Sequence, residues 1–554
     1  MPIDIDYTLG CFYMPKPSYP SHQWISVFIG NQLDRIKELR GQRMPVLGYY
    51  QGDSPLVLDW QIKYAVERGI RFWIFDDYWT EHVDEPVYDT SIRAFMAAEY
   101  RELMTFAMMV TSNSTVEWNH ASKRERFLSR IIPYYVQHYL GEPNYLVVDG
   151  RPFIHIYHTS PALGTMDPGE IRSTLEEADA YISANTSYPG AYWAVGHIQS
   201  STVDFSNEAA AGFDCVSPYY VLPHLFPSSA WPITTPETGI NQTWPVGVPY
   251  SDLAAHAKIT HGEGYVAAAA VGLDFISAAA PDFDSRKNYW VNEHLYFDGQ
   301  NANDYWSMLS NLKGHVDANA ASVPVCDNTG RRMVGLGPWN EQVESSTIEP
   351  GHSALNLNSA DMSPFYMATA AAKVFGGPAD YDETIPGDLS RGFPAITEWT
   401  FQSPAGAGLE LWHTSVTSSL RIDLDDTAAL QVDDGNGMMA TVTNLASNQY
   451  ARLLVQLQLT DGGPLGNVHL RWLGSDYSTS AHEFASPLEP GHQAHAGLMP
   501  STTVTAAGDF EQHEWDLSSS PDWAGQIYYF ELRLVPVAGG HPMRVRVKRF
   551  WLEP

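Results

Sequence analysis

The chain has 554 residues, of which 44% are hydrophobic and 17% charged, so it can bury a large core and is not expected to be disordered. A formal net charge of −32 argues against nucleic acid and anionic membrane surfaces as partners, because both attract clusters of Lys and Arg. At this length, two domains are the simplest expectation.

The chain carries few signals for a disulfide framework, a cofactor or a targeting segment. Cys11, Cys215 and Cys326 are odd in number and far apart, which predicts neither a disulfide framework nor a cysteine metal site. Nucleotide-binding and metalloprotease motifs are absent, so we expect no cofactor and no metal. The first residues, MPIDIDYTLG, lack the basic and apolar regions of a signal peptide. This leaves open an intracellular protein or one whose signal peptide has been removed.

In the first two thirds of the chain, short apolar runs alternate with amphipathic or alanine-rich segments. Strands are predicted at residues 7–14, 70–76, 103–110, 152–158, 191–197, 213–219, 265–272 and 332–337. Helices are predicted at residues 54–69, 167–185, 301–320 and 360–377. Eight strands alternating with helices predict a (β/α)8 TIM barrel, an α/β fold, over residues 1–375.

The texture changes beyond residue 375. Residues 376–394 are rich in Gly, Pro and Asp and are predicted to be a linker. Residues 395–554 contain short alternating strands separated by turn residues, which is typical of an all-β sandwich of the jelly-roll type. This domain could bind glycans through Trp472 or Trp523, or it could buttress the barrel.

Polar and aromatic residues follow the predicted barrel strands, at the end where such barrels place their active sites. Asp274, after the seventh predicted strand, is expected at the same rim. The candidate substrate-binding residues are Tyr50, Asp76, Asp77, Trp79, Asn113, His155, Tyr157, His197, Tyr219, Tyr220, Trp339 and Asn340.

The segment after the last predicted strand, WNEQVESSTIEP (339–350), is rich in acids. Glu341 and Glu344 are candidates for the paired carboxylates that cleave glycosidic bonds, one as proton donor and the other on the opposite side of the bond. Neighbouring acids raise one another's pKa, which keeps one of them protonated near neutral pH. By spacing alone, the two could equally decorate a surface loop.

This segment also resembles the signature NEW-x-E-G-T-x-IEP of glycoside hydrolase family 99 and its relatives. Residues 45–79, 145–157 and 213–220 are similar to other blocks of that family, so that the resemblance covers roughly residues 8–375. It implies a retaining, endo-acting α-glycosidase of the endo-α-mannosidase type.

On this resemblance, Glu341 would deprotonate the 2-hydroxyl of the sugar, which would displace the leaving group and form a 1,2-anhydro sugar. Glu344 would be the general acid and then the base that activates water, and Glu349 would shape the loop exit. The substrate would be an oligo- or polysaccharide with α-linked manno-configured sugars, of the mannose or rhamnose type. The residues that depart from the signature predict an altered substrate, and they are Gln342, Val343 and Ser345.

Two alternatives stay open. The chain could be a non-catalytic glycan-binding or scaffold protein that keeps the barrel rim. It could also be a glycosidase that pairs Asp76 or Asp77 with one glutamate by an ordinary covalent or inverting route.

Overall fold

The structure is a computed structural model, in which two compact units are distinguished. The first contains Arg40–Leu389 together with Met1–Ser18, and the second contains Ser390–Pro554. The residues described are 2–15, 43–47, 50, 52–79, 86, 89–112, 120–158, 167–196, 203–219, 246–283, 295–342, 346–353, 363–386, 398–399, 413–414, 418–422, 428–432, 437–446, 449–461, 465–474, 511–519, 526–536 and 543–554.

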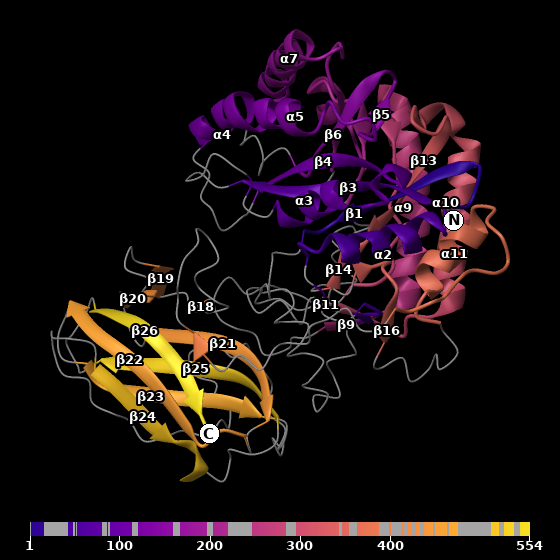
Figure 1. Cartoon of the computed structure of the whole chain (residues 1–554). Helices are drawn as coiled ribbons and strands as arrows, with labels where there is room; N and C mark the ends of the chain where they lie inside the picture. Colours follow the sequence, from indigo (N-terminus) through magenta and orange to yellow (C-terminus); the bar gives the residue numbers. More distant parts are fainter. Residues whose placement is uncertain are drawn as a thin grey trace. The chain divides into compact units, whose positions relative to one another are not determined.

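The first unit is built on a large, mainly parallel sheet with helices around it, a TIM-barrel-like arrangement (Figure 1). Its parallel strands are β1 (Tyr7–Tyr13), β3 (Ile70–Trp79), β4 (Thr105–Ser112), β6 (Arg151–Ile156), β7 (Tyr192–Val195), β8 (Cys215–Val216), β10 (Asp274–Phe275) and β13 (Arg331–Pro338). Their order in the sheet is β10-β8-β7-β6-β4-β3-β1-β13, and every neighbouring pair in this order is parallel. Beyond β13, the short antiparallel strands β12 (Val325–Cys326) and β5 (Val147–Val148) extend the sheet.

The two ends of the parallel series approach each other through glycines of β13. A Cβ atom at Gly335 would lie 2.7 Å from the carbonyl oxygen of Ser277, which follows β10. A Cβ atom at Gly337 would lie 2.9 Å from the carbonyl oxygen of Ala279, and Gly337 has a positive φ of 89°. Only glycine allows the backbones to come this close, so these residues bring the chain after β10 against β13.

Two helices of this unit, α7 (Pro168–Asn185) and α10 (Ala302–Ala318), begin at a side chain that caps them. At α7, for example, the Asp167 side chain accepts hydrogen bonds from the backbone N–H groups of Gly169 and Glu170 at 2.8 and 3.0 Å. The helices are α2 (Pro55–Val66), α3 (Thr90–Ala97), α4 (His120–Arg126), α5 (Ile132–His138), α7 (Pro168–Asn185), α8 (Ser206–Ala210), α9 (Tyr250–Val271), α10 (Ala302–Ala318) and α11 (Tyr366–Val374). Short strands outside the barrel series are β2 (Arg43–Pro45), β9 (Val246–Pro249), β11 (Leu295–Asp298), β14 (Asn340–Glu341), β15 (Ser346–Thr347) and β16 (Gly351–Ser353).

The seventh strand predicted from the sequence is wrong. Residues 265–272 form the end of α9, and the strand, β10, begins two residues later. Alanine has the highest helix propensity, and Gly272 (φ 76°) ends the helix in the left-handed conformation. Asp274 is therefore the first residue of β10 and accepts a hydrogen bond from the Tyr192 hydroxyl, so it lies at the opposite end of the strand from the predicted rim.

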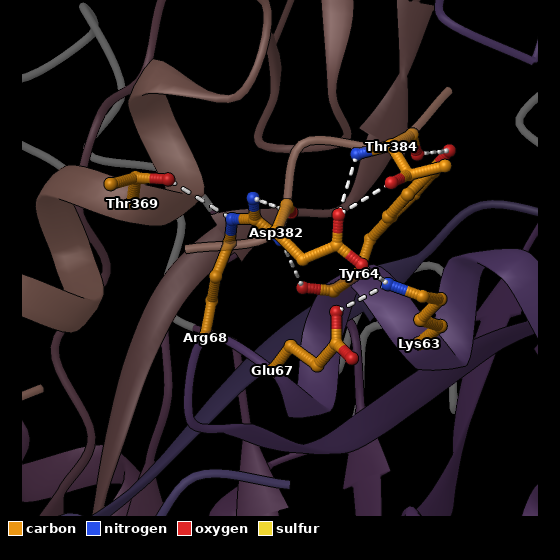
Figure 2. Close-up of polar contacts among 7 residues, drawn as sticks. All are labelled: Lys63, Tyr64, Glu67, Arg68, Thr369, Asp382 and Thr384. Carbon is orange, nitrogen blue, oxygen red and sulfur yellow. Dashed lines mark hydrogen bonds and ion pairs between the residues drawn. The ribbon is translucent and has the colours of Figure 1, made fainter. Parts of the chain in front are cut away.

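The first part of the segment predicted as a linker forms hydrogen bonds and an ion pair with residues at the end of α2. The guanidinium of Arg68, which is fully buried, donates to the carbonyl oxygen of Asp382 at 2.9 Å. The Asp382 carboxylate in turn accepts from the Lys63 ammonium at 2.7 Å and from the backbone N–H of Thr384 at 2.9 Å. Residues as far as 386 therefore belong to the packed first unit. Figure 2 shows the cluster, which comprises Lys63, Tyr64, Glu67, Arg68, Thr369, Asp382 and Thr384.

The second unit consists of two antiparallel sheets in its described part (Figure 1). One contains β19 (Ser418–Ile422), β20 (Ala428–Val432), β26 (Met543–Glu553), β22 (Arg452–Asp461) and β24 (Glu511–Asp516), with β17 (Glu398–Trp399) paired to β26. The other contains β18 (His413–Thr414), β21 (Gly437–Ala446), β25 (Gln526–Pro536) and β23 (Leu465–Gly474). Leu453, Leu454, Val455 and Leu457 of β22 are buried, so both faces of this strand are covered between Leu453 and Val455. The jelly-roll topology stays a prediction.

Candidate active site

Strand register separates the two aspartates of β3. Asp76 lies opposite Met109 of β4, and Met109 lies opposite His155 of β6, so these residues share one face of the sheet. Asp77, the next residue, lies opposite Val110, and its side chain lies on the other face of the sheet because side chains alternate along a strand. Asp76 and His155 therefore face the interior of the barrel together.

Tyr219, which follows β8, lies at the centre of this interior group. Its hydroxyl donates to the Asp76 carboxylate at 3.0 Å, and both residues are buried. Its ring packs on Phe12 with a centroid distance of 4.6 Å and meets the ring of Tyr157 edge-on at 5.6 Å. Aromatic groups and one carboxylate thus gather at the carboxyl ends of β1, β3, β6 and β8.

Glu341 is brought to the same group by the end of the last strand. The backbone N–H of Trp339 donates to the carbonyl oxygen of Phe12 at 2.6 Å, and β14 then pairs with β15 as a short antiparallel hairpin. The Glu341 side chain is 6% exposed. Burial, with the negative charges of Asp76 and Glu341, raises the pKa of Tyr219 well above its usual range. Tyr219 is therefore a neutral hydrogen-bond donor to Asp76, in the electrostatic field of Glu341.

His155, on the same face of the sheet as Asp76, is neutral. Its Nε2 lies 2.8 Å from the carbonyl oxygen of Ser217, which can only accept, so Nε2 carries the proton. Burial lowers the pKa of His155 to about 4. A neutral imidazole with this tautomer can orient and accept at Nδ1, but it is not a proton donor at neutral pH.

Asp77 and Trp79 lie on the opposite face of β3, toward the helices. The Asp77 carboxylate accepts from the Tyr135 hydroxyl at 2.7 Å and from the Trp79 indole N–H at 2.6 Å. Burial raises the pKa of Asp77 to about 7, against the two hydrogen bonds, which lower it. The Trp79 ring is fully buried and packs edge-on against Tyr134. We therefore leave both residues out of the site.

Three further candidates contact other parts of the first unit. Trp339 is fully buried and packs on Trp73, 5.6 Å between ring centroids, in the same layer as Asp77. The Asn340 amide donates to the carbonyl oxygen of Met14 at 3.0 Å and accepts from its N–H at 2.8 Å, which joins β14 to the end of β1. The Tyr50 hydroxyl donates to the Glu349 carboxylate at 2.9 Å.

Four predicted residues lie outside the described part of the chain, and they are Asn113, His197, Tyr220 and Glu344. The Trp472 side chain and Trp523 also lie outside it. Their roles stay predictions.

The geometry adds Phe12 and Tyr78 to the residues predicted to bind substrate. Tyr78 lies two residues after Asp76 on the same face of β3, and its hydroxyl donates to the Met14 sulfur at 3.2 Å. Alternation along β3 could have found Tyr78, because residues two apart share a face. Phe12 of β1 lies opposite Ile74, which is two residues before Asp76 and therefore shares its face of the sheet.

Neither a metal site nor a membrane span is found within the described residues. There, His, Cys, Asp and Glu side chains do not gather in threes as a metal ion would require. The helices of the same part are too short or too polar to cross a bilayer.

Comparison with known proteins gives only distant structural likenesses. No protein-family model matches the chain, and no curated protein does. Among solved structures, the chain is similar to the glycoside hydrolase family 99 endo-α-mannosidase of Bacteroides thetaiotaomicron, with 14% identity, a TM-score of 0.44, and coverage of 67% of this chain and 97% of that one. A glycoside hydrolase-like protein also has 14% identity and a TM-score of 0.44, covering 68% and 97%. A xylan-binding module of Roseburia intestinalis has 10% identity and a TM-score of 0.16, covering 26% of this chain and 92% of that one. At such low scores these likenesses do not decide the function, which must be argued from this chain's own residues.

Proposed function

We propose that the protein is a glycoside hydrolase whose reaction takes place at Glu341. The observation that carries the proposal is the burial of this carboxylate at the carboxyl ends of the barrel strands, beside the Tyr219–Asp76 pair. A carboxylate with little access to water interacts strongly with a bound hydroxyl, and general acid–base catalysis of this kind contributes about 10²–10⁴-fold in rate.

The aromatic surroundings support a sugar as the substrate. The rings of Phe12 and Tyr157 pack on Tyr219, whose hydroxyl donates to the Asp76 carboxylate, and the C–H faces of sugar rings pack on aromatic groups of this kind. Tyr219 and Tyr78 add hydroxyl groups at the same place. Polar groups that fix orientation among apolar walls are the usual composition of a small-ligand site.

We further propose that the enzyme is a retaining, endo-acting α-glycosidase for manno-configured sugars. In this mechanism Glu341 takes the proton of the 2-hydroxyl, whose oxygen attacks the anomeric carbon as the leaving oxygen departs. Glu344 protonates the leaving oxygen and then activates water to open the 1,2-anhydro sugar. The support is the resemblance of residues 339–350 to the family 99 signature, together with the burial of Glu341.

A second candidate mechanism pairs Asp76 with Glu341. The observation that favours it is that both acids border Tyr219, which donates to Asp76 and lies in the field of Glu341. In this route one carboxylate is the nucleophile or base and the other is the acid. Asp77 is excluded from it, because its carboxylate is bonded on the helix side of β3.

The test is a panel of α-mannans, α-rhamnans and other glycans, assayed for released oligosaccharides with the wild type and single variants. Glu341→Gln and Glu344→Gln should each abolish turnover, while Asp76→Asn should leave a measurable rate. Asp77→Asn is the matched control, since it makes the same change one residue away on the opposite face of β3. Loss of turnover in Asp76→Asn and Glu341→Gln, with Glu344→Gln active, would establish the second mechanism. Binding without turnover across the panel would identify a glycan-binding protein instead.

A further inference from the structure

A buried carboxylate lies at the base of the hairpin that carries Glu341. Glu349 is 2% exposed and accepts hydrogen bonds from three neutral side chains. The donors are the Tyr50 hydroxyl at 2.9 Å, the Gln61 amide at 2.7 Å and the Gln342 amide. A buried carboxylate with several donors is strongly fixed, because each lost donor leaves an acceptor unsatisfied in a low dielectric.

Two of these donors anchor Glu349 to the body of the barrel. Gln61 belongs to α2 and is fully buried, and its Oε1 accepts from the Tyr13 hydroxyl of β1 at 2.8 Å. The backbone N–H of Glu349 also donates to the carbonyl oxygen of Trp339 at 2.7 Å. The carboxylate is thus held relative to α2 and β1 by two donors, Tyr50 and Gln61, that lie outside the hairpin.

The third donor joins that fixed point to the catalytic loop. The backbone pairing of the hairpin ends at Glu341 and Ser346, and Gln342 is the first residue of the turn between them. Gln342 is 1% exposed and donates to Glu349 across the base of the hairpin. This hydrogen bond acts directly on the residue that follows Glu341.

We propose that Gln342 and Glu349 are a positioning pair that sets the geometry of the Glu341 hairpin for catalysis. Its catalytic role depends on the function proposed above, whereas its effect on the hairpin does not. The pair also gives a reason for glutamine at one of the positions that depart from the family 99 signature. Its amide N–H donates to the same carboxylate that accepts from Tyr50 and Gln61.

The chain offers a matched control for this pair. Gln342→Met and Gln61→Met make the same substitution, and each removes one amide donor from the same carboxylate. They differ in two ways: only Gln342 lies in the hairpin, and Gln61→Met also removes the acceptor of the Tyr13 hydroxyl. A merely structural role for the hydrogen bonds of Glu349 would therefore give Gln61→Met losses at least as large as those of Gln342→Met.

The first measurement is hydrogen–deuterium exchange of the full chain, which needs no substrate. Gln342→Met should raise exchange of the Ile348 and Glu349 amides, which donate to Pro338 and Trp339 carbonyls, by about tenfold, and Gln61→Met should change them much less. Equal exchange in Gln342→Met and the wild type, or the same increase in both variants, would overturn the proposal.

The second measurement is steady-state turnover on the glycan that the panel identifies. Gln342→Met should lower kcat by about 10–100-fold with KM little changed, because misplaced catalytic groups cost this much. Gln61→Met should keep kcat within about threefold of the wild type. Equal kcat losses in the two variants would refute the positioning role. Absence of wild-type turnover would refute the proposed function alone, since exchange tests the hairpin separately.

Discussion

Asp77 allows the burial argument to be tested by its effect on stability. Its carboxyl is buried behind β3, and burial raises its pKa from 3.8 to about 7. In the unfolded chain Asp77 ionises near its ordinary pKa, while the folded protein keeps it protonated. The contribution of Asp77 to the free energy of unfolding is therefore fully present below about pH 4, falls as the pH rises toward 7, and is lost above that value.

The magnitude follows from the two pKa values. A rise in pKa from 3.8 to about 7 lowers the free energy of unfolding at high pH by about 4 kcal/mol. About 2 kcal/mol of this loss takes place between about pH 5.5 and pH 8.5. Asp77→Asn removes the titration, while the amide oxygen can still accept from Tyr135 and Trp79. The variant should therefore gain about 2 kcal/mol relative to the wild type across this pH range.

The assay is urea unfolding followed by tryptophan fluorescence at several pH values, with equal m-values required for a comparison. Using the difference between variant and wild type cancels the titration of other groups, including His155 and His261, whose burial acts in the opposite direction. A stability difference that stays constant from pH 5.5 to pH 8.5 would refute the reasoning.

Three further substitutions test the packing around the site. Arg68→Met should lower the free energy of unfolding by about 3 kcal/mol, because the hydrogen bonds of the buried guanidinium to Thr369 and to the Asp382 carbonyl are lost. Urea unfolding measures this, and a loss below about 1 kcal/mol would contradict it. Gly10→Ala should destabilise by about 2–3 kcal/mol, because the added Cβ would lie 2.1 Å from the Phe72 ring, and an unchanged thermal midpoint would contradict the packing. His155→Gln should make stability less dependent on pH between about 6.5 and 4, since the wild type loses stability there as the unfolded histidine takes up a proton. A parallel pH profile of the two proteins would count against a buried neutral His155.

Much of the fold could be predicted from the sequence, because apolar runs and helix caps are local signals. The β1, β3 and β13 strands and α2, α7 and α10 begin and end close to their predicted places. The prediction of a strand at residues 265–272 was wrong because a short apolar run is compatible with both a buried strand and a buried helix. Alanine content favours the helix, and the two-residue β10 is too short for periodicity to detect.

The site was less predictable, because it depends on which face of a strand each residue occupies. Asp76 and Asp77 are indistinguishable in composition, yet one meets Tyr219 in the barrel and the other meets Tyr135 among the helices. The distinction follows from register, which only the paired strands determine. The contact of Gln342 with Glu349 could not be predicted either, because it forms only when β14 and β15 pair and bring the two residues together.

The central claim is that Glu341 carries the chemistry, and turnover by Glu341→Gln tests it most directly. On a glycan that the wild type cleaves, the variant should lose about 10²–10⁴-fold in kcat and keep the wild-type unfolding midpoint, with Asp77→Asn retaining activity in the same assay. Wild-type turnover by a folded Glu341→Gln variant would contradict the account.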